Sequence, residues 1–337
     1  MPTWFEPSTS ASHQHENADP PPYSGTGPGA VRGSLLDTGE SRSSAWCSGS
    51  IATVSTGAGS EPAVAAAVAV ARSQGVPCEQ PFVLRQAWHV LVHLAPSRVV
   101  ARVSSGVPFP ERPKPEDVVR ELHVARHAVR AGAPVIPPTE EPDPGPHYQG
   151  AHIVTFWRYV SRRGEVDPRC AGRGLRLIHE ALLDYEGPAL PPAGHGDEVN
   201  EMLAAVQDSA DVELLRTLAS RPPSLDGQAL HGDAHLDNVL PARERLYWHD
   251  LESACRGPRE YDLAALMLRD RRCGGDAPAR AALAAYGPYD ADLLDALVPV
   301  YAAWVYASLL LALPRRPELA PILADRLRWL RRYTGEE

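Results

Sequence analysis

Hydrophobic positions in the first half of the folded chain predict a small sheet with helices beside it. Residues 61–75 are rich in Ala and Val, which predicts a short helix closed by Gly75. Segments 82–94 and 98–103 are rich in Val and Leu and are separated by Ala95-Pro96-Ser97, which predicts a hairpin of two strands. The pattern further predicts a helix over residues 117–130 and a strand over residues 152–160.

The second half of the chain has the longer hydrophobic repeat that is typical of helices. Apolar positions recur with the period of a helix that buries one face. An uncharged run from Leu297 to Leu313 has seventeen residues, the lower limit for crossing a bilayer. Because its neighbours are amphipathic, we expect this run to form a buried core helix. The predicted helices cover residues 172–185, 199–220, 262–271, 277–286, 291–313 and 318–333.

The composition indicates a globular protein with a polar tail. The 337 residues are 44% hydrophobic, which is enough to fill a substantial core. Residues 1–50 are instead dominated by Ser, Pro, Gly, Thr and His, so we expect this tail to be disordered. The formal net charge of -9 argues against a nucleic-acid-binding surface, where basic residues would neutralise phosphates.

The cysteines and the N-terminus favour a cytoplasmic protein that does not associate with a membrane. Cysteines occur at positions 47, 78, 170, 255 and 273, without C-x-x-C spacing, so we expect neither a disulfide framework nor a zinc ribbon. The chain begins Met-Pro-Thr-Trp-Phe-Glu and then becomes polar, without the basic start and apolar core of a secretory signal. A reducing cytosol is therefore the expected location.

The segment from His231 to Asn238 holds the densest set of chemically active residues. It reads His-Gly-Asp-Ala-His-Leu-Asp-Asn, and Asp250 follows after a short predicted hairpin. The catalytic loop of protein kinases reads H-R-D-x-x-x-x-N, where Asp meets the substrate hydroxyl, and Asn and a second Asp hold Mg²⁺. Asp233 and Asn238 stand at the same interval, and their oxygen atoms suit these tasks. The spacing therefore indicates phosphoryl transfer from a nucleotide.

Two other interpretations of this segment stay open. An Asp or Asn in a turn can simply cap a helix or close an Asx turn. The segment could also hold a catalytic metal, because alternate residues of a strand would point to the same side. The six candidate ligands for that metal are His231, Asp233, His235, Asp237, His249 and Asp250.

The chain resembles the aminoglycoside phosphotransferase and choline kinase-like family of small-molecule kinases. The family pattern H-G-D-x-H-x-x-N is matched at every specified position between His231 and Asn238. Residues 257–264 are similar to the G-x-x-x-[WY]-D-L-A segment that follows in that family, and they contain Asp262. The resemblance extends over roughly residues 75–310.

This resemblance implies an α+β, protein-kinase-like fold with two lobes. Residues 51–157 would form a small β-rich lobe that binds the nucleotide, and residues 158–337 would form a larger, mainly helical lobe that holds the catalytic residues. Residues 1–50 would precede both lobes as the tail.

The resemblance also implies a role for each candidate residue. Asp233 would act as the base or orienting group for the acceptor hydroxyl, and Asn238 and Asp250 would bind Mg²⁺. Arg102 stands on the strand where protein kinases have a phosphate-contacting lysine, and Glu121 would pair with it. The remaining implied residues are Trp157 and Tyr159 at the adenine-binding hinge, and His231, His235 and Asp262 as supports of the catalytic loop.

The implied function is Mg²⁺-dependent transfer of the γ-phosphate of ATP or GTP to a hydroxyl of a small molecule. Two other classes stay open: a catalytically silent nucleotide-binding sensor of the same fold, and a metal-dependent hydrolase. The acceptor is not indicated, because its specificity depends on variable helices and loops. Acidic side chains that could contact a cationic acceptor are Glu252, Asp270, Asp276, Asp290, Asp292 and Asp295.

Overall fold

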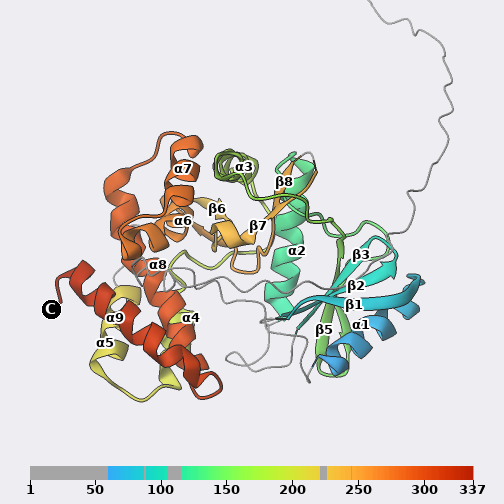
Figure 1. The fold of residues 1–337 in the computed structure, drawn as a ribbon, viewed down its shortest axis with the longest axis horizontal. Coiled ribbons are helices and arrows are strands. Elements are labelled where there is room, and N and C mark those ends of the chain that lie inside the picture. Colours follow the sequence, from blue (N-terminus) through green and yellow to red (C-terminus); the bar gives the residue numbers. More distant parts are fainter. Residues whose placement is uncertain (1–59, 87–88, 105–114, 221–225, 244, 337) are drawn as a thin grey trace, which may run out of the picture. The chain divides into compact units, whose positions relative to one another are not determined.

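A small sheet with two helices, followed by a mainly helical part, makes up the described chain (Figure 1). The computed structural model describes residues 60–86, 89–104, 115–220, 226–243 and 245–336. The tail predicted over residues 1–50 lies outside these ranges. The predicted α+β architecture, with a β-rich part followed by a mainly helical part, is confirmed.

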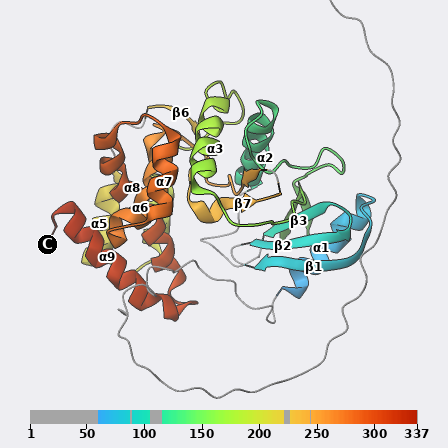
Figure 2. The same ribbon diagram turned by 45° about the horizontal axis from the view of Figure 1, so that its top comes forward.

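The sheet is antiparallel, with the strand order β1-β2-β3-β5-β4. Helix α1 (Glu61–Ser73) packs on one face, and its buried alanines and valine close a core against the sheet (Figure 2). The single strand predicted over residues 82–94 is wrong, because the structure divides this segment between β1 and β2. The strands are β1 (Cys78–Gln86), β2 (His89–Pro96), β3 (Val99–Ser104), β4 (His147–Gln149) and β5 (His152–Arg158).

Helix α2 (Pro115–Arg130) contributes to a different core from that of the sheet. Its buried face includes Leu122, Val124 and Ala125, which belong to the same hydrophobic cluster as the buried residues of the helical part. Glu121 lies on this buried face and is 1% exposed. A charged residue in such a place requires a partner.

Helices α3 to α9 form the rest of the chain together with short strands. The helix predicted over residues 199–220 is two helices, α4 (Gly196–Ala204) and α5 (Ala210–Ser220), and the hydroxyl of Ser209 caps the second by accepting from the Val212 amide. The other helices are α3 (Pro168–Ala181), α6 (Glu260–Cys273), α7 (Ala277–Tyr286), α8 (Ala291–Ala312) and α9 (Ala320–Thr334).

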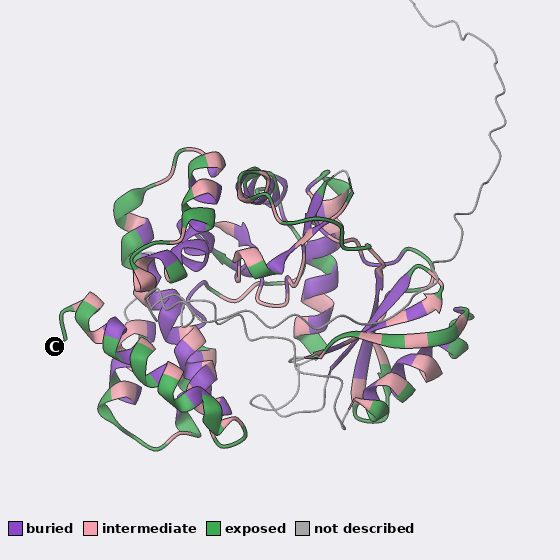
Figure 3. Cartoon of the chain, viewed as in Figure 1, coloured by how far each residue is buried: buried purple, intermediate pink, exposed green. Residues whose placement is uncertain are grey.

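Helix α8 is the central helix of this part. By length and composition it could cross a membrane, but it packs against α4, α5, α6 and α9, and 56% of its most apolar window is buried (Figure 3). Asp290 caps its N-terminus by accepting from the Leu293 amide, 3.0 Å away. The apolar run predicted as a core helix thus lies in the core of the fold.

Two short strand pairs bring the motif segments together. Strand β6 (Gln228–Leu230) pairs with β9 (Cys255–Gly257), and β7 (Val239–Pro241) pairs with β8 (Leu246–Trp248) as the predicted hairpin. The segment between β6 and β7 therefore lies beside the segment between β8 and β9. These two segments contain Asp233, Asn238 and Asp250.

Candidate active site

The carboxylate of Asp233 is held through both of its oxygen atoms. Asn238 Nδ2 donates to Asp233 Oδ2 at 3.2 Å, and His235 Nε2 lies 3.4 Å from the same oxygen. The hydroxyl of Tyr301, on α8, donates to Oδ1. Burial by itself would raise the pKa of Asp233, but His235 and the hydrogen bond from Tyr301 hold it well below its usual range. Asp233 is therefore a carboxylate at neutral pH, with 21% of its side chain exposed.

The loop that carries Asp233 needs glycine at position 232. Gly232 has a φ of +87°, and a Cβ there would lie 1.7 Å from the carbonyl oxygen of Ser253. The two motif segments thus approach each other closely enough that no side chain fits between their backbones. Because β6 ends at Leu230, residues 231–238 form a loop and a single 3₁₀ turn. The strand face proposed for a set of metal ligands is therefore absent from this segment.

Asp262 holds the backbone at the start of the loop. Its carboxylate accepts from the amides of His231 and Gly232, at 2.9 Å and 2.8 Å, and from His179 Nε2 at 2.8 Å. The ring of His231 extends to the neighbouring segment, where its Nε2 donates to the carbonyl oxygen of His249 at 3.1 Å. Asp262 is wholly buried, so these donors replace the water that its charge has lost.

Arg102, on β3, is surrounded by three carboxylates. It donates to Glu121 and Glu252, and to Asp250 Oδ1 at 2.8 Å. His89 Nε2 also lies 2.6 Å from Glu252 Oε2. The expected ion pair between Arg102 and Glu121 is thus present, and Asp250 and Glu252 contact the same guanidinium.

The charges in this cluster do not cancel. Burial alone would lower the pKa of Arg102, but Glu121, Glu252 and Asp250 raise it by a larger amount. The net pKa lies above its usual value, so the guanidinium stays charged. Burial raises the pKa of Glu121 to about 8 in spite of Arg102, since Glu252 and Asp250 are also close. Even with a proton on Glu121, the two carboxylates of Asp250 and Glu252 outnumber the single guanidinium of Arg102, an arrangement that attracts a further cation.

The donor set fits a divalent cation such as Mg²⁺. Asp250 has a φ of +70°, an uncommon conformation for a residue other than glycine, and 38% of its side chain is exposed. The hydrogen bonds that Asn238 makes to Asp233 use Nδ2, so its Oδ1 is not engaged by them. Carboxylate and amide oxygens are hard ligands of the kind that Mg²⁺ binds. Among the described residues, no group of three or more His, Cys, Asp and Glu side chains could hold a metal ion.

The two aromatic residues expected at the hinge are held by the protein itself. Trp157 is 8% exposed, packs in the larger core and donates from Nε1 to Thr155 Oγ1 at 2.9 Å. The ring of Tyr159 stacks on His93 with 3.8 Å between ring centroids. Its backbone amide donates to the carbonyl oxygen of Arg98 at 2.8 Å.

His249 stands before Asp250, where the family more often has an apolar residue. Burial lowers the pKa of His249 to about 4, against the opposing effect of Asp250. The imidazole is therefore neutral at pH 7. A neutral, half-buried ring in this place adds no charge beside Asp250.

Sequence reasoning missed Tyr301 and His89, and gave Glu252 a different place. Tyr301 lies in a long apolar helix, where the pattern predicts only a core aromatic. Glu252 was a candidate for contacting a cationic acceptor, whereas the structure places it against Arg102 and His89. A signal for Glu252 was available, because it lies two residues after Asp250 in the same turn.

The other acidic candidates serve the helices themselves. The carboxylates of Asp276 and Asp290 cap α7 and α8. Asp295 pairs with Arg271, and Asp270 accepts from Arg280 Nε at 2.6 Å. Asp292 is exposed in the first turn of α8. These five aspartates therefore do not support the acidic acceptor site that the sequence suggested.

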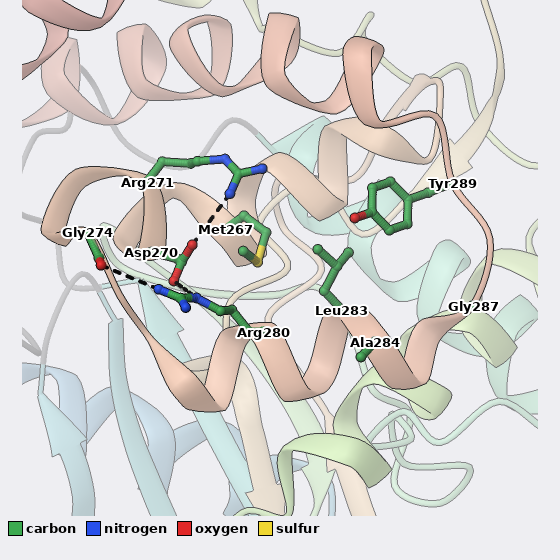
Figure 4. Close-up of a pocket in the computed structure, with 9 residues that line it drawn as sticks. All are labelled: Met267, Asp270, Arg271, Gly274, Arg280, Leu283, Ala284, Gly287 and Tyr289. Carbon is green, nitrogen blue, oxygen red and sulfur yellow. Dashed lines mark hydrogen bonds and ion pairs between the residues drawn. The ribbon is translucent and has the colours of Figure 1, made fainter.

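A hollow of about 580 Å³ between α6 and α7 contains none of the residues predicted for catalysis, nucleotide binding or metal binding, and Asp270 is the one acidic acceptor candidate that lines it (Figure 4). Arg271 and Arg280 both point to the carboxylate of Asp270, which also accepts from the Asp276 amide at 2.6 Å. The charged side chains that line the hollow are therefore already paired with one another. The residues lining the hollow are Met267, Asp270, Arg271, Gly274, Arg280, Leu283, Ala284, Gly287 and Tyr289.

Solved structures with small-molecule kinase activity in their names share this fold. The amicoumacin kinase hAmiN, in complex with AMP-PNP, Ca²⁺ and Ami, aligns with a TM-score of 0.61 at 10% identity, over 78% of this chain and 92% of that one. Choline kinase LicA from Streptococcus pneumoniae aligns with a TM-score of 0.59 at 12% identity, over 80% and 99%. A thermostable mutant of the aminoglycoside phosphotransferase APH(4)-Ia, in a ternary complex with ADP and hygromycin B, has a TM-score of 0.55 at 13% identity, over 78% and 97%.

At such low identities these likenesses establish the fold alone, and they confirm the predicted protein-kinase-like fold with two lobes. The sequence itself establishes the family. No protein of curated function matches the chain significantly. Residues 72–297, well over half of the chain, match the model of the phosphotransferase enzyme family, and this span includes Arg102, Asp233 and Asp250. The resemblance seen in the motifs is thereby confirmed, and the chain belongs to the phosphotransferase enzyme family.

Proposed function

We propose that this protein transfers the γ-phosphate of ATP, or of GTP, to a hydroxyl group of a small molecule. The observation that carries the proposal is the arrangement around Asp233. An ionised carboxylate, held by Tyr301 and His235, lies next to Asn238, and the adjacent segment presents Asp250. These are the groups that phosphoryl transfer requires for orienting the acceptor and binding the metal.

Asp233 would orient the acceptor hydroxyl by accepting its hydrogen bond. Because its pKa is well below the usual range, Asp233 is a weak base, and we assign it mainly an orienting role. In a loose transition state the acceptor keeps its proton until late, so orientation contributes more than early proton removal. His231, His235 and Asp262 would keep the loop in place for this task.

The nucleotide would bind on the side of Arg102. Asn238 Oδ1 and Asp250 would hold Mg²⁺, which when bound neutralises phosphate charge and withdraws electrons from the transferred group. Arg102, fixed by Glu121, would contribute a positive charge toward the phosphates. Trp157 and Tyr159 would position the purine ring of the nucleotide mainly through the backbone of the strand and linker that contain them.

This proposal assigns residues 51–157 to nucleotide binding and residues 158–337 to acceptor binding and chemistry, with residues 1–50 as a tail. The net charge of -9 and the scattered cysteines support a cytoplasmic protein that acts on small molecules and binds neither nucleic acid nor membrane.

The experiment is a screen for ADP release from ATP with the full-length chain. Candidate alcohols should include aminoglycosides, choline and amino sugars, each with Mg²⁺ and with EDTA in its place. We expect at least one alcohol to stimulate ADP release in the presence of Mg²⁺ and to yield a phosphorylated product by mass spectrometry. Tight ATP binding without turnover under any condition would instead identify a nucleotide-binding sensor.

A further inference from the structure

Tyr301 contacts Asp233 from a different part of the fold than the catalytic loop does. The loop supplies Asn238 and His235 to Oδ2, whereas α8 supplies the Tyr301 hydroxyl to Oδ1. Tyr301 is 68 residues away in sequence. The two oxygens of the carboxylate are therefore tied to separate elements, and rotation about the bond to the carboxyl group would break both attachments.

The direction of this hydrogen bond is unambiguous. Burial raises the pKa of Tyr301 well above its usual value, and the adjacent Asp233 raises it further, so the phenol keeps its proton. Asp233 is ionised and can only accept. Hydrogen bonds to an ionised group are stronger than those between neutral groups, so this contact is well suited to holding a carboxylate in one orientation.

The ring of Tyr301 is itself held firmly. It is 3% exposed and lies edge-on to Tyr261, with 5.7 Å between centroids, and 5.9 Å from Trp304. Trp304 in turn stacks on His195 at 5.1 Å. Tyr261 precedes Asp262, the residue that holds the backbone of the loop. The same wall of α6 and α8 thus fixes both the backbone and the side chain of the catalytic loop.

We propose that Tyr301 is a positioning residue for phosphoryl transfer: its hydroxyl sets the rotation of the Asp233 carboxylate, and thereby the direction from which the acceptor hydroxyl is received. A carboxylate offers about four acceptor positions, so the ones left by Tyr301, Asn238 and His235 define where the acceptor can bind. This inference rests on the proposed function, in which Asp233 orients the acceptor.

Tyr306 supplies the matched control. It lies on the same helix and is 1% exposed, yet its buried hydroxyl has no hydrogen-bond partner among the described residues. Tyr301→Phe and Tyr306→Phe therefore remove the same atom from the same helix, and the two variants differ in whether Asp233 loses a donor. Urea unfolding midpoints would show that both variants are folded.

The test measures ADP release from MgATP by the full-length chain, with water, choline or kanamycin as the acceptor, using whichever gives the fastest release. We expect Tyr301→Phe to lower kcat by about 10-fold or more with little change in KM for ATP, which corresponds to losing a hydrogen bond to a charged group. Tyr306→Phe should keep kcat within about 2-fold, as other changes remote from a site do. Equal kcat values for the two variants would overturn the inference.

A double-mutant cycle separates positioning from a general structural role. In an Asp233→Ala background, adding Tyr301→Phe should lower kcat by less than about 2-fold, because the hydroxyl acts through the missing carboxylate. An undiminished second loss would show that Tyr301 acts independently of Asp233. Should Tyr301→Phe fail to fold, Tyr301→Gln and Tyr301→Leu form a second pair. Tyr301→Gln keeps a hydrogen-bond donor and should retain a higher kcat than Tyr301→Leu. Equal kcat values for these two variants would overturn the inference.

Failure of the proposed function has a different signature. A wild-type chain that releases no ADP with any of these acceptors overturns the function itself, and the inference with it. Full activity of Asp233→Ala removes the assignment of Asp233. An active wild type and an impaired Asp233→Ala, with Tyr301→Phe indistinguishable from Tyr306→Phe, overturns the role of Tyr301 alone.

Discussion

The two charged centres of the site, Arg102 and Asp233, are surrounded in opposite ways. Arg102 is a cation in contact with three carboxylates, so its surroundings carry more charge than it can balance. Asp233 is an anion in contact with three hydrogen-bonding groups: a phenol, an amide and an imidazole, and Asp233 raises the pKa of that imidazole, His235, against the opposing effect of burial. Both are buried or nearly so, and each depends on residues from distant parts of the chain.

The difference shows how one site can treat its two substrates differently. An excess of carboxylates on the Arg102 side favours the arrival of metal ions, which a nucleotide brings with it. The donors on the Asp233 side keep that carboxylate charged and leave it able to accept from an alcohol. We expect changes at Arg102 to act mainly on charge balance and stability, and changes around Asp233 to act mainly on turnover.

The largest effect should come from removing the cation. Arg102→Ala leaves Glu121, Asp250 and Glu252 facing one another, and we expect a loss of about 3–5 kcal/mol in the free energy of unfolding, as for other buried ion pairs that lose one partner. Urea denaturation measures it. Added Mg²⁺ should restore more stability to this variant than to the wild type.

Arg98→Ala is the control for that measurement, because Arg98 is an exposed arginine just before the same strand. Its effect should stay within about 0.5 kcal/mol. If Arg102→Ala were as stable as this control, the carboxylates would not need the guanidinium, and the contrast between the two centres would disappear.

Turnover should respond most strongly at the other centre. Asp233→Asn removes the negative charge but keeps the shape, and we expect kcat to fall by about 10²-fold or more while the affinity for ATP changes little. Steady-state ADP release and ATP titration give the two quantities. The exposed Asp237, in the same loop, supplies the control Asp237→Asn, which should be nearly fully active. Undiminished kcat in Asp233→Asn contradicts the assigned role.

The support beneath Asp233 can be tested separately. Asp262→Asn keeps one acceptor oxygen but takes a charge away from two backbone donors and His179, and we expect a loss of about 2 kcal/mol in the free energy of unfolding. Asp292→Asn, at an exposed position of α8, should change it by less than about 0.5 kcal/mol. Equal unfolding midpoints for these two variants would show that the loop does not depend on Asp262.

The smallest effect should appear in the pH dependence of stability. Burial lowers the pKa of His195 to about 4, whereas the unfolded imidazole has its ordinary pKa of about 6.5. Between these values the unfolded state binds more protons, so stability falls as the pH decreases through this window. From pH 7 to pH 5 this one group should account for about 1–2 kcal/mol.

Urea midpoints at the two pH values should therefore differ less in His195→Gln than in the wild type. His123→Gln, at an exposed position, should retain the wild-type dependence. An unchanged pH dependence in His195→Gln would mean that this histidine binds a proton as readily in the folded protein as in the unfolded chain, and that the aromatic wall behind Tyr301 is more polar than the packing indicates.

The elements that could be predicted are those whose signals are local. Helix α1 with its closing glycine, α2 after Pro115 and the helices α6 to α8 follow directly from period and caps. The division between β1 and β2 was missed because residues 86–89 read Gln-Ala-Trp-His, without glycine, proline or asparagine. The division between α4 and α5 had a signal in Asp208-Ser209, which the continuous helical period concealed.

The chemical groups of the site were determined by the sequence itself. The spacing of Asp233, Asn238 and Asp250, the positive charge on β3 and the carboxylate on α2 can all be read from the printed chain. Tertiary structure decided which atoms are in contact. Arg102 contacts Asp250 and Glu252, which follow it in the chain by 148 and 150 positions, and Tyr301 on α8 donates to Asp233. The reason is that a hydrogen bond acts over about 3 Å, whereas a hydrophobic period sets only which face of an element is buried. The alignment between distant elements is set by packing, and packing is a property of the whole fold.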